Sequence, residues 1–153
     1  MPSGFSADPV RQVERSAIVP YSPQQMFELV ADVERYPEFL PWCAYAELHS
    51  RDDRELTGSL GLAQGPLTGR FTTRNRLDAP HAMSIELLEG PFRNLHGQWR
   101  FDALGEQGCR IALQMRFEFD SRVKDLLLGP VFEQTCNRLV DAFVARAGVV
   151  YGS

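Results

Sequence analysis

Histidine and cysteine are the residue types in this chain best suited to acid–base catalysis or metal binding, and their spacing favours neither. Three histidines fall at expected strand ends or turns, where a solvated imidazole is the simplest interpretation: His49, His81 and His96. Three cysteines are far apart, form no Cys-x-x-Cys pair and have no histidine at metal-ligand spacing: Cys43, Cys109 and Cys136. We therefore expect reduced, buried thiols and no metal site.

Arginine accounts for 15 of the 16 basic residues, and its planar guanidinium suits phosphate and RNA recognition. The outward register of the expected strand at residues 67–77 and of its neighbours places six arginines on one sheet face: Arg70, Arg74, Arg76, Arg100, Arg110 and Arg116. Glu86 and Glu118 interrupt that face. Two interpretations therefore stay open, an RNA contact and the ordinary charged face of a half-exposed sheet.

Two short helices are expected after the first strand. Ser22 can cap the backbone N–H groups of the next turn, Pro23 suits the first helical position, and Gln25 completes a capping-box spacing. This pattern predicts a helix at residues 23–32. A second short helix is expected at 33–40, where one proline interrupts it and another ends it.

From residue 42 onward the hydrophobic period is two, which is typical of strands. Six strands separated by short turns are expected at 44–51, 55–64, 67–77, 82–89, 95–104 and 109–120, and a first strand is expected at 13–19. In the last strand apolar residues from Cys109 to Phe119 alternate with polar ones, so one face is buried and the other wet. Helical spacing then predicts a long amphipathic helix at 122–150, kinked or divided at Gly129-Pro130.

The expected fold class is α+β. A curved, seven-stranded antiparallel sheet wraps around the long C-terminal helix, and the two short helices lie between the first and second strands. One helix cannot cover seven strands, so the apolar inner face either leaves a hollow for a small apolar ligand or forms a packed core. The candidate ligand-binding residues are Tyr36, Phe39, Leu40, Trp42, Leu62, Phe71, Leu87, Phe92, Trp99, Met115, Phe117, Phe132, Cys136, Val140 and Phe143.

The segment at residues 36–43 gathers aromatic side chains and prolines at the end of the short helices. It is either the mouth of a cavity, which admits a ligand or touches a bilayer, or a hydrophobic plug between helix and sheet. We expect at least one of Phe39 and Trp42 to face solvent, and Phe92 to lie in a loop that overhangs the cavity. The inner face offers only scattered polar groups, so we expect no catalysis.

Composition limits the class of protein further. The chain has 153 residues, 44% of them apolar and 24% charged, which suits one globular domain. A net charge of −4 argues against binding nucleic acid by bulk charge. No apolar run approaches the roughly 18–20 residues of a membrane-spanning helix, and the N-terminus lacks the pattern of a signal peptide. We expect a cytoplasmic protein with a disordered tail at residues 1–10 and a single domain at 11–151.

Five blocks, in order and spread over residues 13–151, resemble a known family. They are YPEFLPWC at 36–43, GPFR followed by Leu95 and GQWRF at 90–101, FEF at 117–119, GPVFE at 129–133 and AFVARA at 142–147. They are similar to the START-like coenzyme Q-binding family, part of the polyketide cyclase/dehydrase-type helix-grip superfamily. Its bacterial members include the ribosome association toxins of the RatA group.

The resemblance implies a helix-grip fold with a deep hydrophobic cavity. It also implies a non-catalytic role: binding ubiquinone or a related isoprenoid lipid, as a ligand rather than a catalytic cofactor, to support respiratory electron transport. A peripheral contact with the inner membrane would accompany that role. The same resemblance implies an alternative, a toxin-like translation inhibitor that binds the large ribosomal subunit and blocks subunit association. We take ubiquinone binding as the leading expectation; in the alternative, the six arginines would be the ribosome contact.

Overall fold

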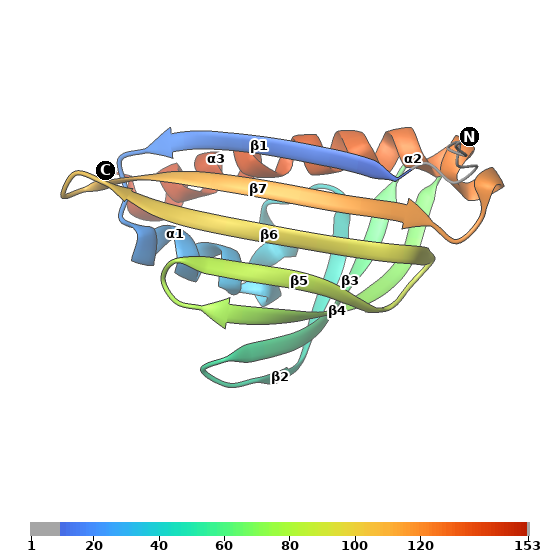
Figure 1. Cartoon of the computed structure of the whole chain (residues 1–153), viewed down its shortest axis with the longest axis horizontal. Coiled ribbons are helices and arrows are strands. Elements are labelled where there is room, and N and C mark those ends of the chain that lie inside the picture. Colours follow the sequence, from blue (N-terminus) through green and yellow to red (C-terminus); the bar gives the residue numbers. More distant parts are fainter. Residues whose placement is uncertain (1–9, 153) are drawn as a thin grey trace, which may run out of the picture.

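The computed structural model describes residues 10–152, so the tail expected at residues 1–10 lies outside the described residues except for Val10. Within the described part, seven strands form one antiparallel sheet in the order β1-β7-β6-β5-β4-β3-β2. Figure 1 shows this sheet curving in front of α2 and α3. The α+β class and the seven-stranded sheet are therefore confirmed. The elements are β1 (Arg11–Val19), α1 (Pro23–Ala31), the 3-10 helix η1 (Val33–Glu38), β2 (Cys43–Arg51), β3 (Glu55–Gln64), β4 (Leu67–Asp78), β5 (Ala82–Glu89), β6 (Phe92–Leu104), β7 (Gly108–Phe119), α2 (Arg122–Asn137) and α3 (Leu139–Tyr151).

The helix α1 begins as the capping pattern predicts. Ser22 Oγ accepts a hydrogen bond from the backbone N–H of Gln25 at 3.1 Å, and the Gln25 side chain accepts one from the backbone N–H of Ser22 at 2.9 Å. Pro23 lies in the first turn, where its missing N–H costs no helical hydrogen bond. The cap therefore fixes the direction of α1, which buries Met26 and Val30 completely.

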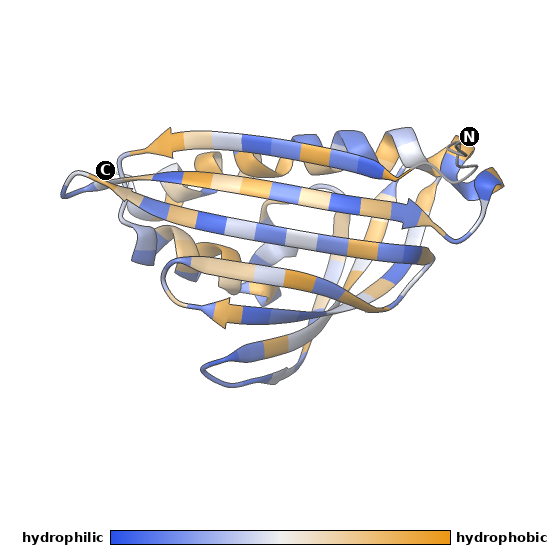
Figure 2. Cartoon of the chain, in the orientation of Figure 1, coloured by the Kyte–Doolittle hydropathy of each residue, from blue (hydrophilic) through white to orange (hydrophobic). Residues whose placement is uncertain are grey.

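Alternation along the strands divides the sheet into a buried concave face and an exposed convex face. Figure 2 shows hydrophobic and hydrophilic residues alternating along β6 and β7. The buried pair Trp99 and Leu113 lies next to the exposed pair Gln98 and Gln114 in the register of these strands. Each large apolar side chain buried in this way contributes about 1.5–3 kcal/mol, so a shift of register by one residue would be costly.

The concave face and the helices share two hydrophobic clusters. In the first, the Trp99 ring lies 5.3 Å from that of Phe143 on α3, and Phe101 lies 5.7 Å from Phe27 on α1. In the second, Phe132 of α2 is surrounded by phenylalanines of β4, β6 and β7. Aromatic contacts thus hold both ends of the helical layer against the sheet.

The C-terminal helix is interrupted, although not where the sequence predicts. α2 continues through Gly129-Pro130 and ends at Asn137, and Arg138 separates it from α3. The backbone N–H of Arg138 bonds to the carbonyl of Thr135 at 3.2 Å, and this three-residue spacing tightens the turn and ends the helical ladder. Pro130 removes only its own N–H, and the helix continues around it. Of the two outcomes predicted at Gly129-Pro130, a kink or a division, the division is therefore wrong.

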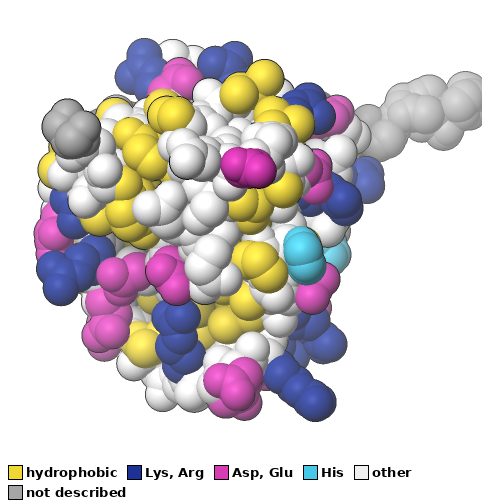
Figure 3. All heavy atoms as spheres, turned by 90° about the vertical axis from the view of Figure 1, so that its left-hand side faces the viewer, with side chains coloured by type: hydrophobic (Ala, Val, Ile, Leu, Met, Phe, Trp, Pro, Cys, Tyr) yellow, Lys and Arg dark blue, Asp and Glu magenta, His cyan; other side chains and the backbone are white. Residues whose placement is uncertain are grey.

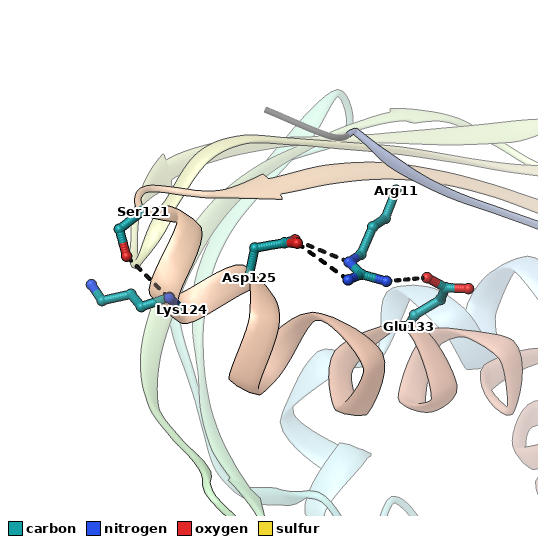
Figure 4. A network of polar contacts seen from close by, with 5 residues as sticks. All are labelled: Arg11, Ser121, Lys124, Asp125 and Glu133. Atoms are coloured by element: carbon teal, nitrogen blue, oxygen red, sulfur yellow. Dashed lines mark hydrogen bonds and ion pairs between the residues drawn. The ribbon is translucent and has the colours of Figure 1, made fainter. Parts of the chain in front are cut away.

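Arg11 joins the N-terminal half of α2 to β1 (Figure 4). Its Nε donates to Asp125 Oδ1 at 3.0 Å, and its Nη1 donates to Glu133 Oε1 at 2.9 Å. The guanidinium lies against the helix at Gly129, where an added Cβ would lie 2.3 Å from Arg11 Nε. The missing side chain at Gly129 is therefore what allows the arginine to reach both carboxylates.

Candidate functional site

An internal cavity of about 70 Å³ lies between the concave sheet face and the helices. Eight of the fifteen candidate ligand-binding residues line it: Tyr36, Trp42, Phe71, Trp99, Met115, Phe132, Cys136 and Phe143. Sites for small molecules usually enclose about 300–1,000 Å³. The inner face is therefore mostly filled by its own side chains, and what remains is a small void in a packed core.

The other seven candidates do not line this cavity: Phe39, Leu40, Leu62, Leu87, Phe92, Phe117 and Val140. The expectation that Phe92 lies in a loop and overhangs the cavity is wrong. Phe92 begins β6, pairs with Phe119 in the sheet ladder and is only 5% exposed. Its ring lies 5.1 Å from that of Phe132, so it belongs to the second hydrophobic cluster. Pairing with the end of β7 extends β6 by three residues beyond the expected start at residue 95.

Sequence reasoning missed cavity residues that the helix spacing could have found. Relative to Phe132, three further residues that line the cavity lie on the same helix face at i+3, i+7 and i+11: Thr135, Leu139 and Phe143. Only Phe143 was among the candidates, although the helix expected at 122–150 already places Thr135 and Leu139 on the same face. Strands β4 and β5 add Thr73, Asn75 and Ile85.

The polar groups beside the cavity already bond to one another or to the backbone. Thr73 Oγ1 donates to Asn75 Oδ1 at 2.9 Å, and Thr135 Oγ1 donates to the Val131 carbonyl at 2.9 Å. Tyr36 Oη donates to the carbonyl of Val30. Among residues 10–152 no group of three His, Cys, Asp or Glu side chains is placed to hold a metal ion. The cavity therefore lacks the convergent free polar groups that acid–base catalysis needs.

Burial keeps the titratable groups of the cavity neutral. It raises the pKa of the Tyr36 hydroxyl and of the Cys136 thiol well above their ordinary values. It also raises the pKa of Cys43, at the start of β2, to about 11. All three cysteines are buried and free, in agreement with their interpretation as buried thiols. Near pH 7 none of these groups is ionised, so none is an activated nucleophile.

A surface groove of about 560 Å³ runs outside the cavity, between the segment after η1 and the helices. It is lined by Leu40, Pro41, Trp42, Gln64, Pro130, Val131, Gln134, Thr135, Arg138 and Ala142. Trp42 and Thr135 line both the groove and the cavity, so these two side chains form the wall between them. Trp42 and Phe39 are each half-buried rather than solvent-facing. Arg146 covers Phe39, with its guanidinium carbon 4.9 Å from the ring centroid.

The six candidate arginines all lie on the convex face, and carboxylates neutralise three of them. Arg70 pairs with Glu47 at 2.6 Å, Arg74 with Glu86 at 3.2 Å, and Arg100 with Asp102 at 3.6 Å. The remaining three have no carboxylate partner in the described part of the chain: Arg76, Arg110 and Arg116. Figure 3 shows basic and acidic side chains interspersed at one end of the molecule. The arginine set is therefore not one uniform positive surface.

Comparison with known proteins gives relatives over nearly the whole chain. The ribosome association toxin RatA of Pseudomonas aeruginosa is 44% identical over 140 residues, which cover 92% of this chain and 97% of that protein. The protein of the same name from Escherichia coli K12 is 37% identical and covers 93% of this chain and 90% of its own length. A mitochondrial coenzyme Q-binding protein COQ10 homologue of Xenopus laevis is 27% identical, and the match covers 92% of this chain and 59% of that protein.

These relatives correct the leading expectation. Ubiquinone binding in support of respiration is contradicted, because the curated relatives at 37–44% identity are named ribosome association toxins and the coenzyme Q-binding relative is more distant. The error has a physical source: an inward-facing aromatic register is common to a ligand pocket and to a packed core. Here the rings close on one another and leave about 70 Å³.

Solved structures show the same fold. The aromatase/cyclase Zhui of a Streptomyces species superimposes with a TM-score of 0.79 at 19% identity, covering 94% of this chain and 99% of that one. An 18 kDa protein of Caulobacter crescentus superimposes with a TM-score of 0.73 at 30% identity, with the same coverage of 94% and 99%. Residues 19–144 match the family described as polyketide cyclase / dehydrase and lipid transport. On sequence and fold together, the chain belongs to this helix-grip family, in which RatA proteins are its relatives.

Proposed function

We propose that this chain binds the large ribosomal subunit and limits the association of the two subunits, without catalysing a reaction. The observation that supports this most strongly is the identity of 37–44% to ribosome association toxins across at least 90% of both chains. The match therefore extends over nearly the whole length of this chain and of these relatives.

The charge distribution favours a contact of limited size over a bulk electrostatic one. A net charge of −4 opposes general attraction to RNA, so binding depends on arginines that face solvent without a carboxylate partner. Arg76 and Arg116 meet that description on the convex face and make no side-chain hydrogen bond within the described residues, whereas Arg110 Nη2 donates to Ser16 Oγ at 3.2 Å. A paired arginine such as Arg70 would first have to separate from its carboxylate, which makes it a weaker RNA contact.

A non-catalytic role fits the interior. The polar groups of the cavity are hydrogen-bonded to one another or to the backbone, and burial raises the pKa of the Cys136 thiol and of the Tyr36 hydroxyl, which favours their neutral forms. In the described part of the chain no helix is long and apolar enough to cross a membrane. A location among ribosomes, in the cytoplasm, follows from the proposed partner.

Cosedimentation of the purified chain with isolated ribosomal subunits tests this proposal. We expect the chain to move with the large subunit and not with the small one. Binding should weaken as salt rises, with a slope of log K against log salt of roughly −1.4 to −1.8 if two arginines each displace about 0.7–0.9 counterions. The double variant R76E/R116E should remain at the top of the gradient. A wild-type chain that remains there with either subunit would overturn the proposal.

A further inference from the structure

The convex face carries a hollow of about 460 Å³ over the first half of β6 and the second half of β7. Among the described residues it is lined by Val10, Asn94, His96, Gly97, Gln98, Gln114, Arg116, Phe117 and Glu118. The sheet register places its polar side chains in facing pairs: His96 opposite Arg116 and Gln98 opposite Gln114. His96 therefore lies within β6, and the expectation that it lies at a strand end or turn is wrong. The volume lies in the range of small-molecule sites.

Three neighbouring side chains in this hollow are free to bind a partner. The side chains of Arg116, His96 and Gln98 are exposed and make no hydrogen bond or ion pair within the described residues. This distinguishes Arg116 from Arg74, which lies on the same face but is held by Glu86. The hollow thus combines one unneutralised guanidinium, an imidazole and an amide on adjacent positions of two strands.

Among the described residues one carboxylate, that of Glu118, lines the hollow, and it already has partners. Asn94 Nδ2 donates to Glu118 Oε1 at 3.0 Å, and Arg93 Nη1 lies 4.0 Å from Glu118 Oε2. The Glu118 side chain is only 12% exposed. Its negative charge is therefore turned toward its own partners, and it does not exclude an anion from the position beside Arg116.

We propose that this hollow is an RNA-binding site that takes a phosphodiester against Arg116 and His96 and an unpaired base against Gln98 and Gln114. Arginine matches the phosphate oxygens with its fork of donors, and amides carry both a donor and an acceptor for a base edge. Such reading of bases is available only in loops, bulges and ends of RNA, where a base is free to leave its stack. The inference rests on the proposed ribosome binding and locates its point of contact.

Affinity for isolated large subunits, measured at several salt concentrations, tests this site. We expect R116A to weaken binding roughly tenfold and to reduce the magnitude of the salt slope by about one unit, because one phosphate contact is lost. Q98L should weaken binding severalfold and leave the salt slope unchanged, because the amide carries no charge. All variants replace exposed side chains and should melt within a degree or two of the wild type.

Arg110 provides the matched control. It lies on the same face of the same strand and also has no carboxylate partner among the described residues, but it is six residues from Arg116, about 20 Å along β7. R110A should therefore weaken binding less than threefold. Equal losses in R110A and R116A, or no loss in R116A, would overturn the site while leaving ribosome binding intact.

A short single-stranded RNA separates this inference from the proposed function. If the wild-type chain fails to bind large subunits but binds the oligonucleotide with an affinity that R116A reduces and R110A does not, the ribosome proposal fails and the site stands. If the chain binds neither, both are overturned. Fluorescence anisotropy of a labelled oligonucleotide gives this readout directly.

Discussion

Replacing Arg11 with alanine should loosen the N-terminal half of α2 from the sheet. The Arg11 guanidinium reaches both oxygens of Asp125, at 3.0 and 3.2 Å, and Glu133 at 2.9 Å. The Asp125 side chain is only 9% exposed, so the substitution leaves a nearly buried carboxylate without its cation. The perturbation is therefore the loss of a joint between β1 and α2 together with an uncompensated charge.

The exposure of the partners sets the size of the effect. Breaking a fully buried ion pair costs about 3–5 kcal/mol, whereas an exposed pair contributes about 0–1 kcal/mol. Arg11 at 22% and Glu133 at 37% exposure lie between these limits. We expect a loss of about 2–3 kcal/mol in the free energy of unfolding, which lowers the Tm by roughly 4–12 °C in a domain of this size.

Thermal and urea unfolding followed by circular dichroism measure this loss, with Arg15→Ala as the matched control. Arg15 is on the same strand but lies 3.8 Å from Asp141, and both side chains are exposed, so its loss should cost less than about 1 kcal/mol. If the two variants are destabilised equally, the proposed joint between β1 and α2 is refuted.

Gly129 adds a test in which the sign of the effect reverses. A Cβ at this position would lie 2.3 Å from Arg11 Nε, so Gly129→Ala should destabilise the wild-type protein. Alanine is otherwise favoured over glycine inside a helix by about 1 kcal/mol. In the Arg11→Ala background the obstacle is gone, and the same substitution should raise the unfolding free energy by up to about 1 kcal/mol. The same sign in both backgrounds would contradict the geometry.

Two further predictions concern the core. Phe92→Ala should lower the unfolding free energy by about 3–5 kcal/mol, because the Phe92 ring is buried in the second hydrophobic cluster. Leu88→Ala, at an exposed position, should change it by less than about 0.5 kcal/mol. Comparable losses for the two variants in urea titrations would argue against the placement of Phe92 in the core. Burial raises the pKa of the Cys43 thiol from 9.0 to about 11, so the folded protein favours the neutral thiol. The contribution of this neutral thiol to the free energy of unfolding is complete below pH 9 and is lost as the pH rises toward 11. The urea concentration at the midpoint of unfolding should fall as the pH rises from 9 to 11, and it should fall less steeply in Cys43→Ala. The same dependence on pH in both proteins would exclude Cys43 as a cause.

Local patterns predict the elements of this fold well because their determinants lie close together in the sequence. Alternation predicts each strand to within three residues, and Ser22 with Gln25 predicts the start of α1. The break at Arg138 depends on a backbone hydrogen bond to Thr135, which has no signature as strong as that of Pro130. The early start of β6 depends on pairing with Phe119, a contact that is distant in sequence.

The candidate site was less predictable because it depends on distances between strands. Alternation indicates which rings point inward, but the volume of the cavity left between them, about 70 Å³, depends on how the rings pack. Likewise, the outward positions of Arg74 and Arg116 follow from the pattern, whereas the register determines that Glu86 neutralises Arg74 and that no carboxylate among residues 10–152 neutralises Arg116. The resemblance to the family implied two functions. The choice between them depended on the sequence identity, which is 37–44% to ribosome association toxins and 27% to the coenzyme Q-binding relative.

Reassociation of purified ribosomal subunits tests the central claim most directly. Large subunits are incubated with increasing amounts of the chain, small subunits are then added at a Mg²⁺ concentration that supports pairing, and light scattering reports the fraction of paired ribosomes. We predict that pairing falls and reaches its minimum at roughly equimolar chain, and that R116A requires a higher concentration than R110A. Undiminished pairing at a large excess of the wild-type chain would contradict the proposed function.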